Sequence, residues 1–67
     1  MKELRFKKDS GCILQVVEFN DGQVVAVWVT GAVHEVAIYK NLKEFLSVRT
    51  PERGYTKIYE SDYGWFI

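Results

Sequence analysis

Hydrophobic and polar residues alternate along several short segments, a period-two pattern that indicates β-strands with one face toward a core. Near the N-terminus, Leu4 and Phe6 alternate with Arg5 and Lys7. The segment 24–29 reads Val-Val-Ala-Val-Trp-Val and is apolar on both faces, which favours a central strand. The whole pattern predicts strands at residues 4–8, 12–19, 24–29, 33–39 and 55–60, with a short final strand at 65–67.

Turn-forming residues separate the first four of these segments. They are Asp9-Ser10-Gly11, Asn20-Asp21-Gly22 and Thr30-Gly31-Ala32. The Asp-Gly step of the second turn is the strongest hairpin signal in the chain, because it suits the mirror-type turns and bulged loops that join neighbouring strands. Short turns of this kind predict antiparallel pairing between consecutive strands.

One helix interrupts the strand pattern, at about residues 41–49. Asn41 is a typical N-cap, and Glu44 stands three residues later, as in a capping box. Pro51 ends the helix, because the residue before a proline avoids the α conformation. The apolar residues of the segment fall on one helical face: Leu42, Phe45 and Leu46.

Together these elements predict a mainly β fold with one short helix, in a single small globular domain over residues 1–67. We expect an antiparallel twisted sheet of four to six strands, or a partly closed SH3-like or OB-like barrel. The helix would cover an open end or one face. A flatter sandwich of four strands and a helix is the alternative.

The small size of the chain limits how it can be stabilised. A domain of 67 residues buries only about 60% of its unfolded surface, so its stability is marginal without further support. Cys12 is the only cysteine and His34 the only histidine, which excludes an internal disulfide and weighs strongly against a four-ligand zinc site. We expect no metal and no cofactor. Aromatic packing, at 15% of the residues, and self-association as a homodimer remain.

The sequence also bounds the compartment. A single cysteine fits a reducing environment. The N-terminal residues contain no apolar stretch of the signal-peptide type, and no apolar run approaches the roughly 20 residues of a membrane span. We therefore expect a cytoplasmic protein that does not contact membranes.

Residue types used in catalysis do not fall into a recognisable motif. The five glycines are scattered at turns rather than gathered in a phosphate-binding loop. Cys12 and His34 would form a nucleophile–base pair only if their strands met, and a lone cysteine of this kind is typically a small core residue. The sequence therefore predicts a protein that is not an enzyme.

Aromatic residues near the C-terminus are the candidate binding site. Tyr55 and Tyr59 fall on one face of a predicted strand, with Lys57 between them. Three more aromatic residues follow the strand, namely Tyr63, Trp65 and Phe66. Because tyrosine and tryptophan dominate interface hot spots, these five aromatic residues predict binding to another protein. Such a module would act as an accessory inhibitor, of the kind that phages or plasmids encode, or as an assembly subunit. The alternative is that the tail closes the core.

A nucleic-acid-binding barrel is the second candidate function. Its phosphate contacts would come from a basic N-terminal strand with Lys2, Arg5, Lys7 and Lys8, while the tyrosines would stack on bases. Nine basic residues are balanced by nine acidic ones, however, and a neutral chain is a poor electrostatic ligand for nucleic acid. The lysines also suit a solvated edge strand, where they prevent aggregation. We therefore favour a protein partner over nucleic acid.

Overall fold

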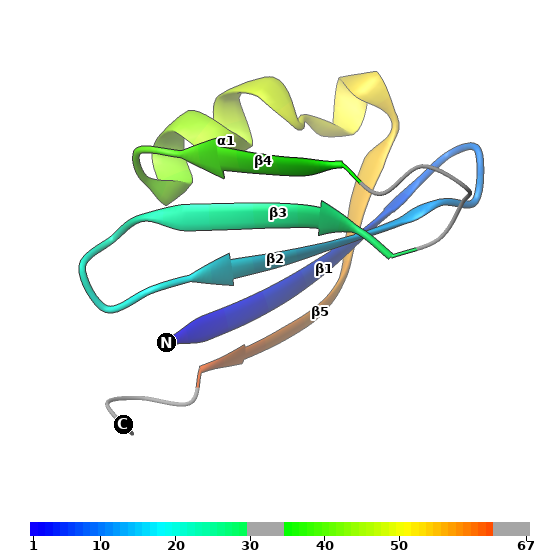
Figure 1. The fold of residues 1–67 in the computed structure, drawn as a ribbon. Helices are drawn as coiled ribbons and strands as arrows, with labels where there is room; N and C mark the ends of the chain where they lie inside the picture. Colours follow the sequence, from blue (N-terminus) through cyan, green and yellow to red (C-terminus); the bar gives the residue numbers. More distant parts are fainter. Residues whose placement is uncertain (30–34, 63–67) are drawn as a thin grey trace.

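The computed structural model describes residues 1–29 and 35–62, which form one open antiparallel sheet and one short helix (Figure 1). The elements are β1 (Lys2–Lys8), β2 (Ile13–Glu18), β3 (Val24–Trp28), β4 (Val36–Tyr39), α1 (Leu42–Val48), a 3-10 turn (Pro51–Arg53) and β5 (Tyr55–Asp62). Their order across the sheet is β4-β3-β2-β1-β5. This confirms the predicted mainly β fold with one helix, in the form of an open sheet. The strand predicted at 65–67 lies outside the described residues.

The position of β1 corrects two predictions. β1 pairs with β2 on one side and with β5 on the other, so it is not an edge strand. As a result β2, and not β3, occupies the middle of the sheet. The cause is a long-range pairing, because β5 follows the helix in sequence and returns to β1. Local alternation of residue types carries no information about such a return.

The hairpin between β2 and β3 forms where the sequence predicts it. Gly22 adopts a φ of +93°, the left-handed region that glycine enters without strain. The backbone N–H of Phe19 donates to the carbonyl oxygen of Gln23 at 2.9 Å. The side chain of Asp21 also accepts from the N–H of Gln23, at 3.0 Å. Both bonds close the turn and set the register of the two strands.

The helix begins at the predicted cap. Asn41 Oδ1 accepts a hydrogen bond from the backbone N–H of Glu44 at 2.8 Å. The carboxylate of Glu44 reaches back to the N–H of Lys40 at 3.1 Å, one residue before the cap. At the other end, the N–H of Arg49 donates to the carbonyl oxygen of Phe45 at 3.0 Å. Asn41 and Arg49 therefore flank the helix as its two caps.

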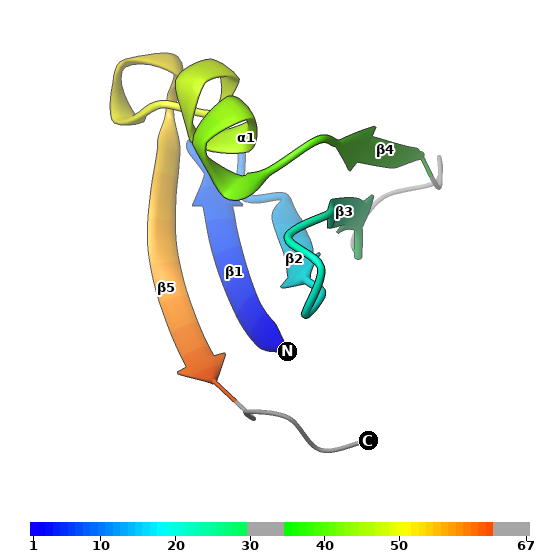
Figure 2. The same cartoon turned by 90° about the vertical axis from the view of Figure 1, so that its left-hand side faces the viewer.

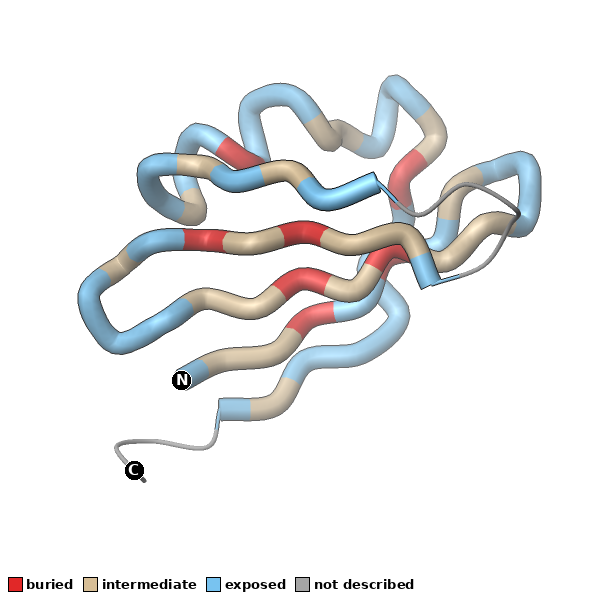
Figure 3. Tube along the Cα trace, viewed as in Figure 1, coloured by how far each residue is buried: buried red, intermediate tan, exposed pale blue. Residues whose placement is uncertain are grey.

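The core lies between α1 and one face of the sheet. Figure 2 shows the helix over this face, between β4 and β5, and Figure 3 shows the buried positions along the strands below it. Phe45 is the buried residue of the helix, and its ring lies 5.4 Å from the ring of Phe6 and 5.2 Å from that of Tyr39. The buried residues are Leu4, Phe6, Leu14, Val16, Val24, Ala26, Phe45 and Tyr55.

Candidate functional site

The opposite face of the sheet has no helix over it in the described part of the chain (Figure 2). Side chains alternate between the two faces along a strand, so the neighbours of the buried Val24 and Ala26 point to this face. Val36 and Ile38 of β4 also point there and are 63% and 66% exposed, more than any other large hydrophobic residue in the described ranges. The face is therefore apolar near β3 and β4.

The strand register joins these apolar side chains into one surface. Val25 of β3 stands opposite Val17 on β2 and Ile38 on β4, and Val27 stands opposite Val36. We refer to Val17, Val25, Val27, Val36 and Ile38 as the apolar patch. Its three members on β2 and β3 are half-buried, since each is flanked by strands on both sides.

Next to the apolar patch, on β1 and the middle of β2, this face carries polar side chains that contact one another. The guanidinium of Arg5 donates to the carboxylate of Glu3 at 3.0 and 3.2 Å, and Gln15 Nε2 donates to the same oxygen at 2.6 Å. The guanidinium of Arg5 also lies 4.7 Å from the ring centre of Tyr59, a cation–π distance. This polar region gives the apolar patch a hydrophilic border on the β1 side.

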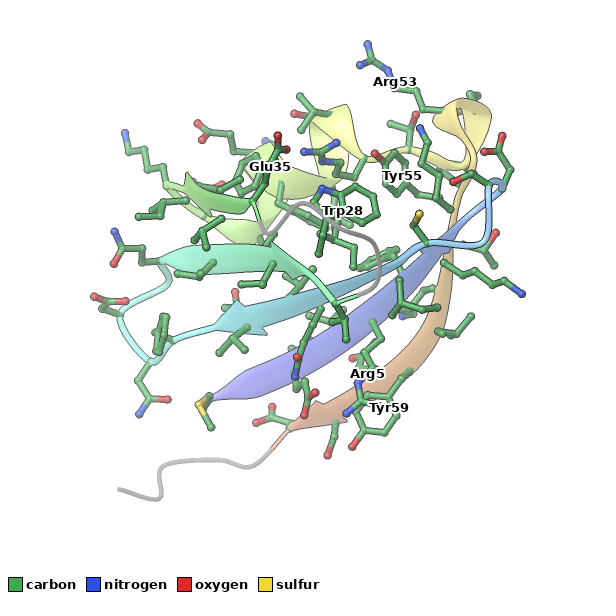
Figure 4. The ribbon with its side chains drawn as sticks, turned by 45° about the vertical axis from the view of Figure 1, so that its right-hand side comes forward. Arg5, Trp28, Glu35, Arg53, Tyr55 and Tyr59 are labelled. Atoms are coloured by element: carbon green, nitrogen blue, oxygen red, sulfur yellow. The ribbon has the colours of Figure 1, made fainter. Side chains whose placement is uncertain are left out.

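Tyr55 and Lys57 share a face as predicted, but the prediction that Tyr59 lies on the same face is wrong. Tyr59 pairs with Arg5, but the next residue of β1, Phe6, pairs with Lys57, so Ile58 is an extra residue in a β-bulge. Tyr59 consequently lies on the helix-free face with Arg5, while Tyr55 lies with Trp28 on the helix side (Figure 4). Tyr55 is only 4% exposed, so it is a core residue. Of the other predicted binding residues, Tyr63, Trp65 and Phe66 lie outside the described residues.

The four predicted basic residues do not form one strip. Arg5 and Lys7 point to the helix-free face, whereas Lys2 and Lys8 alternate with them and point to the helix side. Lys2 Nζ lies 3.2 Å from the carboxylate of Glu60, whose hydrogen bond and charge raise the pKa of Lys2. Lys8 Nζ stands 4.8 Å from the ring centre of Tyr55.

A cluster around Arg49 was not predicted from the sequence. Arg49 Nε donates to the hydroxyl of Tyr39 at 3.2 Å, and Nη1 donates to the hydroxyl of Tyr55 at 2.7 Å. Burial disfavours the charged form, but these two hydrogen bonds raise the pKa of Arg49 above its ordinary value. The ring of Trp28 lies 6.3 Å from that of Tyr55. Because Trp28, Tyr39 and Tyr55 come from three separate strands, no local pattern signals the cluster.

Trp28 and Arg49 also border a small cavity of about 200 Å³ at this end of the molecule. Glu35 lies at its rim, near Trp28 in Figure 4, and apolar side chains complete the wall. Trp28 is partly buried and packs against the core. Within residues 1–29 and 35–62, no group of three or more histidine, cysteine or acidic side chains converges to hold a metal ion. The helix of the described chain is too short to cross a membrane.

The fold and this face define a small, open-sheet β protein with one helix on one side and an apolar patch on the other. Residues 8–62 match the family described as Acb5 phage protein, so the chain belongs to that family. No curated protein and no solved structure matches the chain.

Proposed function

We propose that this protein is a non-enzymatic protein-binding module of a phage, and that it contacts its partner through the apolar patch. The observation that supports this most directly is the exposure of Val36 and Ile38 on a sheet face that no helix of the described chain covers. Contiguous exposed apolar side chains with a polar border are typical of protein interfaces. The partner would present an apolar surface of its own.

Membership in the Acb5 phage protein family supports the accessory role that the sequence favours, either as an inhibitor or as an assembly subunit. We propose that the protein works in the cytoplasm, where the free thiol of Cys12 would stay reduced. The proposed binding site therefore lies on β2, β3 and β4, and not on the strand that carries Tyr55 and Tyr59. Tyr59, on the same face as the apolar patch, is the predicted residue that the proposal retains.

The nucleic-acid alternative receives less support from the arrangement of charges. The basic side chains of β1 are divided between two faces, and Lys2, Arg5 and Lys8 each contact a carboxylate or an aromatic ring of the same chain. A phosphate backbone would have to compete with these contacts. Binding to nucleic acid is therefore the alternative outcome of the experiment described next.

The test is affinity capture of the tagged protein from infected cells, with and without nuclease. The variant Val25→Lys places a charge in the centre of the apolar patch, and Thr56→Lys places the same charge on the polar side of the same face. We expect a stoichiometric protein that survives nuclease and binds the wild type and Thr56→Lys, but not Val25→Lys.

Circular dichroism must show that both variants keep the β fold. If Val25→Lys unfolds, Val25→Thr replaces it, because threonine has nearly the shape of valine but adds a polar hydroxyl. Equal capture by the Val25 variant and the wild type would overturn the proposed patch. Loss of all captured material after nuclease treatment would favour nucleic acid instead.

A further inference from the structure

The two edges of the sheet differ in how they are protected. The β5 edge carries Lys57, Glu60 and Asp62 and contains the bulge at Ile58, and both charge and bulges prevent other strands from pairing with an edge. The β4 edge reads Val-Ala-Ile-Tyr and has no charged residue, no proline and a regular register with β3. In the described part of the chain, β4 is therefore the unprotected edge.

The backbone of β4 also has hydrogen-bonding groups that face away from the sheet. The N–H of Trp28 donates to the carbonyl oxygen of Glu35 at 3.4 Å, which makes these two residues a hydrogen-bonded pair. In an antiparallel ladder such pairs alternate, so the peptide groups of Ala37 and Tyr39 also face β3, while those of Val36 and Ile38 face outward. Figure 2 shows α1 over the sheet face and not across this edge.

We propose that the occupant of this edge is a second copy of the chain, whose β4 pairs antiparallel with this β4 across a twofold axis. The register that pairs both outward residues of each β4 places Val36 opposite the partner's Ile38, and these two residues then exchange two hydrogen bonds. Ala37 lies on the axis, opposite the partner's Ala37. The two five-stranded sheets become one continuous sheet. This inference stands independently of the function proposed above.

The side chains of β4 suit this symmetric arrangement. A non-hydrogen-bonded pair brings Cα atoms to about 4.5 Å, and alanine is small enough for that approach. Val36 and the partner's Ile38 would form a cross-strand apolar pair, which covers one flank of the two most exposed hydrophobic side chains of the described chain and leaves them on the helix-free face. Glu35 precedes the strand and Lys40 follows it, so antiparallel pairing brings the acidic end of each strand near the basic end of the other.

The interface would be small, because β4 has only four residues. It falls below the roughly 1,200 Å² of a stable complex, so we expect a dissociation constant between about 1 μM and 1 mM. Sedimentation equilibrium of the full chain over this range is the test. Amide hydrogen exchange of Val36 and Ile38 should also slow as the protein concentration rises, since their N–H groups would become bonded in the dimer.

Two variants separate edge pairing from face-to-face stacking of the apolar patches. Ile38→Pro removes an outward N–H and is tolerated at an unpaired edge position, so it should weaken association at least tenfold. Val25→Lys alters the face but not the edge and should dimerise like the wild type. The opposite result, with Val25→Lys monomeric and Ile38→Pro dimeric, would overturn the proposal, as would a wild type that stays monomeric at 1 mM.

A structural control is needed for Ile38→Pro. Ile38→Thr keeps the outward N–H and shortens the apolar side chain, so it should associate more strongly than the proline variant. If both variants are equally monomeric while circular dichroism shows a native fold, side-chain burial and not strand pairing holds the copies together, and the edge register is wrong.

Discussion

Phe45 is the residue through which α1 contacts the core. It is fully buried, and its ring packs edge-on against Tyr39 and at a tilt against Phe6. In so short a chain, two aromatic contacts on one side chain are a large share of the net stability, since a core of this size supplies only about 3–5 kcal/mol. The abundant aromatic side chains of this sequence therefore stabilise the packing of α1 against the sheet, and Phe45 makes the contacts.

Replacing Phe45 with leucine should lower the free energy of unfolding by about 1–3 kcal/mol, because both ring contacts are lost while most of the volume remains. Urea unfolding followed by circular dichroism measures the change. Phe19→Leu is the matched control, since Phe19 is 44% exposed and should change stability by less than about 0.5 kcal/mol. Equal effects of the two substitutions would contradict the packing role of Phe45.

Gly54 is constrained by both its backbone and its surroundings. It has a φ of +91°, and a Cβ placed there would lie 2.6 Å from Asp9 Oδ2. Gly54→Ala should therefore destabilise the protein by more than Gly22→Ala, which has a similar φ of +93° but open space around it. We expect about 1–2 kcal/mol for Gly22→Ala from backbone strain alone.

The same urea titrations test the contribution of the clash. Combining Gly54→Ala with Asp9→Ala should bring the loss of stability close to that of Gly22→Ala, because only the backbone strain remains. If Gly54→Ala lowers the free energy of unfolding no more than Gly22→Ala does while Asp9 is present, the Asp9 carboxylate moves away and does not restrict the side chain at position 54.

At the scale of elements, the cap of α1 tests how much a side chain contributes to starting a seven-residue helix. Asn41→Ala removes the acceptor for the N–H of Glu44 and should cost about 1 kcal/mol. Thermal unfolding should show the loss, and Asn41→Asp should restore most of the stability because its carboxylate accepts the same bond. An aspartate variant as unstable as the alanine variant would show that the cap bond is not the cause.

The elements that could be predicted are those with local signals. The hairpin at residues 20–22 and the helix start at Asn41 follow from residue types within one turn of chain, and the structure confirms both. The bulge at Ile58 could not be predicted, because it arises only where β5 meets β1. That single extra residue places Tyr55 in the core and Tyr59 on the opposite face, which separates the predicted binding pair.

At the scale of the whole molecule, the helix decides which face of the sheet becomes the core. Alternation alone predicts that Val36 and Ile38 share a face, and they do. It does not predict whether that face is covered, since this depends on where α1 packs after β4. The candidate site therefore follows from tertiary placement, as does the contact of Arg49 with two tyrosines.

Glu60 links β5 to β1, since one of its carboxylate oxygens lies 3.2 Å from Nζ of Lys2 on β1, while the other lies 2.6 Å from Nζ of Lys57 on its own strand. These lysines lower its pKa below the ordinary value of 4.5. The contribution of Glu60 to stability is thus fully present above pH 4.5, the ordinary pKa, and is lost as the pH falls through the lowered pKa of the folded state.

Glu60→Gln should destabilise the protein at neutral pH. It should also reduce the loss of stability that the wild type shows as the pH falls, which urea unfolding at several pH values measures. Glu52→Gln, an exposed change outside the sheet, should keep the wild-type profile. Identical acid profiles for Glu60→Gln and the wild type would show that the lysines do not stabilise this carboxylate in the folded state.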